Sequence, residues 1–253
     1  FIGNYLQTLL SPLISVVMPS VINLWSYPET GFHSLAAAQI KERYEKEALS
    51  TAFRILGEGQ LTLTKFLLLT DEPVNLKDSK AVFEAVLSKC SFEDGFYIFS
   101  NTANDTLDYT GPRLNMGSKA IMLGVGKKKR ELPERLDKTP ARPIANCVVF
   151  CKGVVAIDGL PNDYDLTTLA QDDAFKSWPL IILVDNALEA TSSPLEFLWT
   201  VFTRFEPQAD IYPKNTKLHR HHIRYEPPLV IDARMKERYP KEAIVDNHTK
   251  ELV

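Results

Sequence analysis

Two stretches of the chain that begin more than a hundred residues apart follow the same plan. Each has an apolar run that ends in aspartate, a helical pattern, a phenylalanine and, six residues later, an isoleucine. These landmarks are Asp71, Phe92 and Ile98 in the first stretch and Asp185, Phe205 and Ile211 in the second. A strand–helix–strand unit that occurs twice predicts an internal duplication within an α/β architecture. Chance similarity between two ordinary units of this kind is the alternative.

The same patterns predict how the chain is organised. We expect an α/β fold in which duplicated strand–helix–strand units form mixed sheets flanked by helices. Residues 1–126 would form a first domain, and residues 144–253 a second, related one with an extended C-terminal tail. Residues 127–143 combine a basic run with three prolines and lack apolar periodicity, which is typical of a linker. The tail from residue 218 onwards is rich in proline and charge, and we expect it to wrap across a neighbour.

Local periodicity predicts the individual elements. Helices are expected at residues 2–18, 44–56, 78–89, 165–176 and 195–202, and the first of these, which is mostly apolar, is expected to be buried. Strands are expected at residues 21–27, 32–40, 64–70, 144–150 and 153–157. The near-continuous apolar run at 64–70 indicates a strand that is buried on both faces.

Charge and composition limit the kinds of partner. The 253 residues carry a formal charge of −3 with a pI near 6.0, which gives no electrostatic footprint for nucleic acid or for an anionic membrane surface. No run of eighteen apolar residues is present, so no integral membrane segment is expected. Three cysteines, Cys90, Cys147 and Cys151, lack a framework spacing, which favours a cytoplasmic protein over a secreted disulfide scaffold. Because the chain enters apolar sequence directly at Phe1, we expect a piece of a longer protein.

Few residues carry a recognisable chemical motif. The sequence has no nucleophile elbow, zinc-protease helix, Walker loop or dinucleotide-binding glycine pattern. His219 and His221 would share one face of a strand, but no cysteine or carboxylate nearby completes a metal site, so a polar edge or a contact between subunits is favoured. The segment 117–119, which ends in Lys119, could receive an anion, although a tight bend before a strand is the favoured interpretation.

Lys41 ends one predicted strand and opens a predicted helix. At such a place backbone dipoles and an ammonium group can converge on an anion. An ordinary surface lysine is the alternative, and on the residues alone it is the commoner case.

Eight short motifs resemble, in their order and spacing, the C-terminal domain of the UbiD family of decarboxylases. They are Gly-Phe-His-Ser-Leu at 31–35, Ile-Lys-Glu-Arg-Tyr at 40–44, Gly-Glu-Gly-Gln-Leu at 57–61, Thr-Lys-Phe at 64–66, the strand ending at Asp71, Val-Asn at 74–75, Leu-Asp-Tyr at 107–109 and Gly-Ser-Lys at 117–119. Each motif alone has low specificity, and the resemblance depends on their common order. After 117–119 the family usually continues with glycine and aspartate, whereas this chain has the apolar residues 120–123.

The resemblance implies a chemistry and a set of site residues. Members of the family remove or add carboxylate groups on aromatic and α,β-unsaturated acids with prenylated flavin mononucleotide (prenylated FMN), a divalent metal (manganese or magnesium) and potassium. By resemblance, Lys41 is similar to the lysine that reaches the cofactor phosphate. The substrate pocket would be bordered by Leu107, Asp108, Tyr109 and Thr110, and an anion could be contacted by Lys119.

The resemblance also implies what lies outside this chain. The catalytic Arg-Glu-Glu set and the metal ligands of the family belong to a preceding flavin-binding domain, so no catalytic residue and no metal ligand is expected here. A fragment of this kind should be inactive alone. Its expected partners are that N-terminal domain, further copies in a homo-oligomer (dimer or hexamer) and a small aromatic acid.

The longer region beyond residue 126 narrows the resemblance. Its helix-to-strand segment at 199–210 resembles the family motif even better than the first repeat does. In this longer region the chain is similar to long-form members of the family, which are associated with menaquinone synthesis through futalosine. The implied substrate is either a dihydroxynaphthoate or a hydroxybenzoate of ubiquinone synthesis. Two alternatives to an enzyme part stay open: a non-catalytic oligomerisation or assembly module, and a stand-alone binder of a phosphate ligand.

Overall fold

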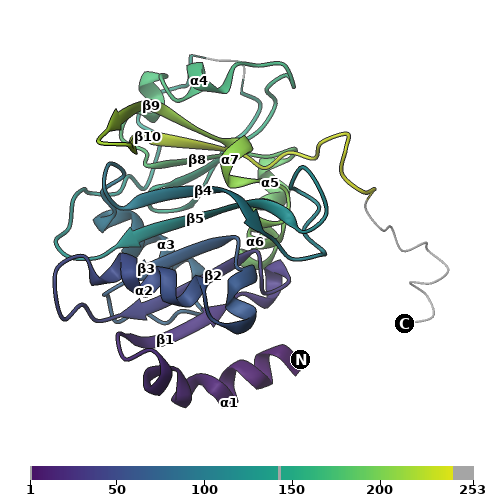
Figure 1. The fold of residues 1–253 in the computed structure, drawn as a ribbon. Coiled ribbons are helices and arrows are strands. Elements are labelled where there is room, and N and C mark those ends of the chain that lie inside the picture. Colours follow the sequence, from purple (N-terminus) through teal and green to yellow (C-terminus); the bar gives the residue numbers. More distant parts are fainter. Residues whose placement is uncertain (1, 142–143, 242–253) are drawn as a thin grey trace.

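The computed structural model describes residues 2–141 and 144–241, which form two five-stranded mixed sheets with helices on their faces (Figure 1). The expected α/β fold with flanking helices is confirmed. The first sheet contains β1 (Val21–Ser26), β2 (Leu35–Ile40), β3 (Phe66–Thr70), β5 (Met116–Gly124) and β4 (Phe96–Ala103), in that order. The second contains β6 (Cys147–Cys151), β7 (Val154–Ile157), β8 (Leu180–Leu183), β10 (His222–Asp232) and β9 (Ile211–His219).

The two sheets have the same connectivity. In each, the three central strands are parallel and the two outer strands run antiparallel to their neighbours. Strand β8 occupies the position of β3, and β9 that of β4, so the landmarks of the two sequence stretches fall at matching places. The internal duplication predicted from the sequence is therefore confirmed.

The aspartate that ends the middle strand makes similar contacts in both repeats. Asp71 accepts hydrogen bonds from Lys89 Nζ at 2.7 Å and from a backbone N–H just after β5 at 2.8 Å. Asp185 accepts from Arg204 at 3.3 Å and from a backbone N–H just after β10 at 2.9 Å. In both cases a base near the C-terminal end of the covering helix and the end of the last parallel strand meet at one carboxylate.

Several helices begin where the sequence supplies a cap. They are α1 (Ile2–Val17), α2 (Glu47–Leu56), α3 (Ser79–Lys89), α4 (Leu166–Leu169), α5 (Ala187–Ala190), α6 (Pro194–Phe202) and α7 (Pro207–Asp210). The side chain of Asp78 accepts from a backbone N–H of α3, and Ser193 does the same at α6, where a proline follows at the first helical position.

Alternation along the strands gives every sheet two apolar faces, and this layers the molecule. The inner faces of both sheets and the apolar sides of α3, α5 and α6 form one continuous core. The outer face of the first sheet packs against α2, and that of the second against α4 and the segment after it. Rings from the two repeats meet in the shared core: Phe83 of α3 lies 6.0 Å from Phe202 of α6, centroid to centroid. The two repeats therefore share one hydrophobic interior.

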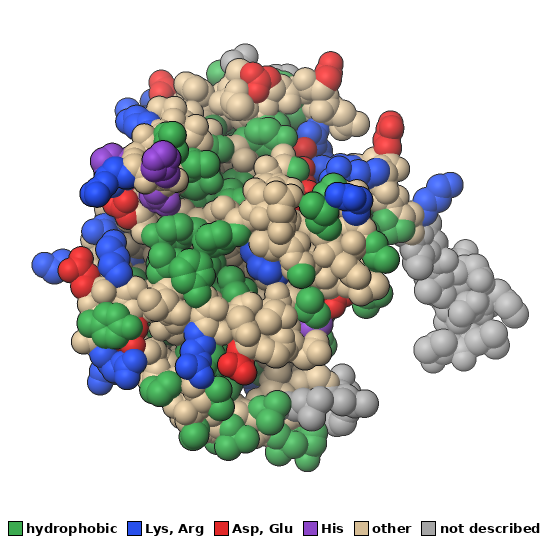
Figure 2. Space-filling view, in the orientation of Figure 1, with side chains coloured by type: hydrophobic (Ala, Val, Ile, Leu, Met, Phe, Trp, Pro, Cys, Tyr) green, Lys and Arg blue, Asp and Glu red, His purple; other side chains and the backbone are tan. Residues whose placement is uncertain are grey.

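Helix α1 is exposed, contrary to the expectation of a buried helix. It lies along β1 at the border of the first sheet, and Leu9, Leu10, Leu13 and Val16 are all more than half exposed. Figure 2 shows apolar side chains gathered along the lower border of the molecule, where Figure 1 draws α1. The periodicity predicted the helix correctly, but the helix has more apolar side chains than its contact with β1 can bury. Among the described residues, no helix combines the length and apolar character needed to cross a bilayer.

Four further expectations were wrong in detail. Residues 117–119 lie inside β5 and form no bend, because the apolar run extends to both sides of them. His219 and His221 do not share a strand face, since residues 220–221 have positive φ and form the turn between β9 and β10. The helix expected at 165–176 is only one turn long and is followed by a short 3₁₀ turn. The expected tail first supplies β10, a strand of the second sheet, and residues 238–239 beyond it contact the first repeat, while its residues 242–253 lie outside the described part of the chain.

Candidate functional site

The structure places Lys41 on the surface, directly after β2 at the carboxyl end of the parallel strands. Its backbone N–H donates to Ser20 O at 2.9 Å, which holds the start of the loop that leads into α2. The ammonium group has no partner among the described residues. Lys41 is thus accessible to another domain, as the resemblance requires, although its role stays a prediction.

A buried carboxylate organises the loop that carries Lys41. Glu47, in the first turn of α2, is 2% exposed and accepts from Ser20 Oγ at 2.6 Å and from Arg43 Nε at 2.8 Å. The side-chain hydrogen bond from Arg43 is the largest cause that lowers the pKa of Glu47 to about 2. Glu42 caps α2 by accepting the N–H of Ala48 at 2.9 Å. The loop is therefore held at both ends by carboxylates.

This loop fits an anionic group such as a phosphate. Arg43 keeps more than half of its side chain exposed (58%) while its guanidinium is anchored by Glu47, and Lys41 lies two residues before it. The two cations stand next to the N-terminus of α2, where backbone N–H groups also favour negative charge. Sequence reasoning found Lys41 but missed Arg43 and Glu47, although the alternation of acids and bases over 41–47 was a usable signal.

The other candidate residues lie at the opposite end of the first sheet. Gln39 of β2 pairs with Thr70 of β3, so Lys41 lies two residues beyond the level of Thr70. Ala120 of β5 pairs with Phe66 of β3, so Lys119 lies one residue before the level of Phe66. Along the strands the two lysines are therefore about seven residues apart. At roughly 3.3 Å per residue the two lysines are separated by about 23 Å along the strands. Residues 107–110 belong to the loop that enters β5 at this far end. The structure therefore does not bring Lys41 together with residues 107–110 or Lys119.

Within residues 107–110, exposure and burial alternate. Leu107 is 86% and Tyr109 37% exposed, whereas Thr110 is completely buried. Asp108 accepts from Thr110 N at 2.9 Å and forms an ion pair with Lys65 at 3.0 Å. Only Leu107 and Tyr109 could thus border a ligand through their side chains, and Asp108 is committed to a buried partner.

Lys65 belongs to a buried polar junction between the repeats that the sequence analysis missed. Its side chain is 1% exposed, and its ammonium lies 5.5 Å from the ring centroid of Phe205 of the second repeat. Glu206 and Asp210, both buried, face the same region, and desolvation raises the pKa of each. The available signal was a lysine directly before a strand of five apolar or β-branched residues, a position that requires a buried partner.

Lys119 is also largely buried. Its ammonium donates to Thr64 O at 2.9 Å, and burial lowers its pKa to about 8. The side chain is 7% exposed, so an anion could reach it only by entering the protein. Its predicted contact with an anion stays untested, and the structure gives it a structural partner.

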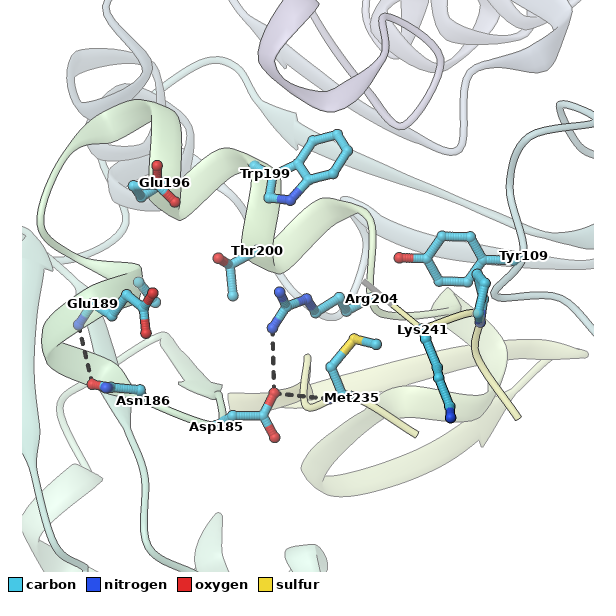
Figure 3. A pocket seen from close by; sticks show the side chains of 12 residues that line it. Tyr109, Asp185, Asn186, Glu189, Glu196, Trp199, Thr200, Arg204, Met235 and Lys241 are labelled. Carbon is cyan, nitrogen blue, oxygen red and sulfur yellow. Dashed lines mark hydrogen bonds and ion pairs between the residues drawn. The ribbon is translucent and has the colours of Figure 1, made fainter. Parts of the chain in front are cut away.

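A cavity of about 700 Å³ lies at the carboxyl ends of the strands of the second sheet (Figure 3). Its walls come from Asp185, from helices α5 and α6, from residues after β10 and from Tyr109 of the first repeat. Crevices at this end of parallel strands are a common location for ligands in α/β proteins. Tyr109 is the one residue among the expected pocket-border positions 107–110 that lines this cavity. No group of three or more potential metal ligands occurs within residues 2–141 and 144–241.

The first half of the chain matches a known protein family, and the whole chain is similar to longer proteins. Residues 1–124 match the family of 3-octaprenyl-4-hydroxybenzoate carboxy-lyase C-terminal domains. A Chlamydia trachomatis protein is 47% identical over all of this chain and 44% of its own length. A 4-hydroxybenzoate decarboxylase subunit of Chlamydia pneumoniae is 47% identical over all of this chain and 43% of its own length. The chain spans less than half the length of these relatives.

Among solved structures, the vanillic acid decarboxylase of Sedimentibacter hydroxybenzoicus in its closed form is similar over 53% of this chain and 28% of its own, with 21% identity and a TM-score of 0.43. The UbiD-class enzyme HmfF of Pelotomaculum thermopropionicum is similar over 54% of this chain and 30% of its own, with 20% identity and a TM-score of 0.42.

Proposed function

We propose that this chain is the C-terminal part of a UbiD-class aromatic acid decarboxylase, because its residues 1–124 match the family of 3-octaprenyl-4-hydroxybenzoate carboxy-lyase C-terminal domains. The substrate of the whole protein would be a hydroxybenzoate or a dihydroxynaphthoate of quinone synthesis. The name of the Chlamydia pneumoniae relative supports the first of these. The three free cysteines support the proposed cytoplasmic location.

The proposed cofactor is prenylated FMN, which supplies an electron sink for the loss of carbon dioxide when it is bound. Its ring, a divalent metal and potassium would be held by the preceding part of the longer protein. In this chain Lys41 and Arg43 would hold the phosphate, since both are exposed and Glu47 fixes the loop between them. The domain would also exclude water from one wall of the cofactor site.

The observation that carries the proposal is the accessibility of Lys41. A lysine that reaches a phosphate on another domain must lie at the surface on a rigid loop, and both conditions hold here. A lysine packed into the hydrophobic interior could not perform this role.

The test uses the full-length protein with Lys41→Ala. We expect flavin occupancy and turnover to fall at least tenfold while the oligomeric state and the melting temperature stay unchanged, because a charge-assisted hydrogen bond is typically worth about 1.5–3 kcal/mol. The control is Lys176→Ala, which removes the same charge from an exposed site on the second repeat. Unchanged flavin occupancy in Lys41→Ala would refute this role.

A second candidate is an assembly module, and the exposed apolar residues of α1 favour it. In this case the duplicated repeats would build contacts between subunits in a dimer or hexamer, and Lys41 would have no ligand. Substituting Leu9 and Leu13 by glutamine in the full-length protein would then dissociate the oligomer without changing flavin occupancy in the protomer. A stand-alone phosphate binder would instead bind FMN as the isolated chain, which titration of the chain with FMN measures directly.

A further inference from the structure

The cavity of the second repeat has walls of distinct chemistry. Glu196, Trp199 and Thr200 are spaced three and four residues apart on α6 and therefore share one face of the helix. All three line the cavity, and Figure 3 shows them with Glu189 of α5 on one side and Tyr109 on the other. Trp199 is 49% exposed, so a large aromatic surface is available to a ligand.

Part of the charge in the cavity is already neutralised. Asp185 accepts from Arg204 and from a backbone N–H after β10, so this carboxylate and this guanidinium balance each other. The carboxylates of Glu189 and Glu196, by contrast, have no hydrogen bond or ion pair within residues 2–141 and 144–241. Among the described residues, Lys241 is the only other base that lines the cavity, and it lies exposed at the rim opposite Glu189. The groups still free to bind a ligand are thus mainly negative.

Thr200 adds an uncharged polar group to the wall of the cavity. Its side chain is 8% exposed, and its hydroxyl has no hydrogen-bond partner among the described residues. Other threonines near the helix ends bond back to a carbonyl, as Thr203 does to Trp199 O at 2.7 Å. Thr200 lies in the cavity between Glu189 and Arg204 in Figure 3. This hydroxyl lines the cavity and is therefore available to a polar group that enters it.

We propose that this cavity binds a small organic cation, an amine or guanidinium on an apolar skeleton. The charged group lies between Glu189 and Glu196 and donates to Thr200 Oγ, and the skeleton packs on Trp199. Carboxylates satisfy the donors of such a cation, and an indole face attracts its charge. The site is separate from the Lys41 loop, which lies on the other sheet, so this inference does not depend on the proposed function.

A matched series of ligands tests the sign of the charge. Benzylamine, benzyl alcohol and benzoate share a ring and differ in charge, and each is titrated into the full chain at pH 7 by calorimetry. We expect benzylamine to bind at least about tenfold more tightly than benzyl alcohol, because charge-assisted hydrogen bonds are stronger than neutral ones. Benzoate should not bind. The affinity for benzylamine should also fall with added salt.

Variants locate the site. Glu196→Gln and Thr200→Val should each weaken benzylamine binding, the former by about tenfold, while Glu58→Gln, which removes the same charge from an exposed site of the first repeat, should leave it unchanged. Benzylamine should also change the tryptophan fluorescence of the native chain but not that of Trp199→Phe, a readout that does not depend on the two other variants. Equal or tighter binding of benzoate, full affinity in Glu196→Gln, or no benzylamine binding up to about 10 mM would overturn the proposal.

Discussion

The buried ion pair between Lys65 and Asp108 yields a prediction that separates a structural role of Asp108 from a role at a substrate pocket. The side chains are 1% and 7% exposed, and the ammonium and carboxylate lie 3.0 Å apart. Asp108→Asn keeps the size of the side chain and an acceptor for Thr110 N, but it removes the charge that compensates Lys65. The change therefore leaves a buried ammonium group without its strongest counter-charge.

The magnitude follows from the burial of the pair. Removing one partner of a buried ion pair typically costs about 3–5 kcal/mol. Unfolding entropy of about 2.1 cal/mol/K per residue gives roughly 0.5 kcal/mol/K for 253 residues, so the melting temperature should fall by about 6–10 °C. Lys65→Met combined with Asp108→Leu should cost less than Asp108→Asn alone, because neither charge is then left buried.

The loss should depend on pH in a defined direction. Burial lowers the pKa of Lys65, and Asp108 opposes this effect. Without Asp108 the pKa of the folded state falls further below the unfolded value of about 10.4, so between these two values the unfolded chain binds more protons. The stability of the variant relative to the native chain then rises with pH, and the deficit should shrink as the pH approaches the unfolded value.

Urea denaturation followed by circular dichroism at several pH values measures both effects. The control is Glu131→Gln, which breaks the Lys128–Glu131 ion pair. The 2.6 Å contact of this pair is shorter than that of Lys65 and Asp108, but its side chains are 53% and 88% exposed, so the control separates burial from distance. That variant should lose less than about 1 kcal/mol. If Asp108→Asn loses no more than this control, or if its deficit does not change with pH, the reasoning from burial is refuted.

Three further predictions concern titratable groups. The pKa of Glu47 is lowered from 4.5 to about 2, so its contribution to the free energy of unfolding is present above pH 4.5 and is lost as the pH falls toward 2. Glu47→Gln should therefore reduce the loss of stability over this pH range. An unchanged slope would contradict the hydrogen bonds of Glu47 with Arg43 and Ser20. Burial lowers the pKa of Lys119 from 10.5 to about 8, so the contribution of this group to stability rises between these values. Lys119→Met should therefore make the change of the urea midpoint with pH less positive over this range, and an unchanged slope would contradict the burial of Lys119. Burial raises the pKa of Cys90 to about 12 and that of Cys147 to about 11. The thiols of the folded chain should therefore react slowly with Ellman's reagent at pH 8, and the half-buried Cys147 should react first. Rapid reaction of all three free thiols would count against this packing.

The sequence was sufficient for the features that depend on periodicity. The repeat, the mixed sheets and helices such as α3 and α6 follow from apolar spacing and from local caps at Asp78 and Ser193. The exposure of α1 could not be predicted in the same way. A mostly apolar helix is equally compatible with a buried position and with a surface that another part of a longer protein covers.

The candidate site was predicted only where its residues are close in sequence. Lys41 could be identified from its position between a strand and a helix, and it does lie at an accessible edge. The partnership of Asp108 with Lys65, 43 residues apart, depends on how the loop before β5 folds back onto β3. The cavity of the second repeat depends on the contact of that same loop with the residues after β10. Neither contact leaves a periodic signal in the sequence.

The length of one loop distinguishes two repeats that have the same topology. The connection between β4 and β5 spans residues 104–115, whereas β9 and β10 are joined by residues 220–221 alone. The long loop reaches the second repeat, where Tyr109 lines the cavity and packs on Tyr239 with ring centroids 5.0 Å apart. Asp108, the adjacent residue, anchors the loop on Lys65 of the first repeat. The stability of the buried pair and the shape of the cavity are therefore coupled, so Asp108→Asn should weaken benzylamine binding as well as folding, although Asp108 does not line the cavity.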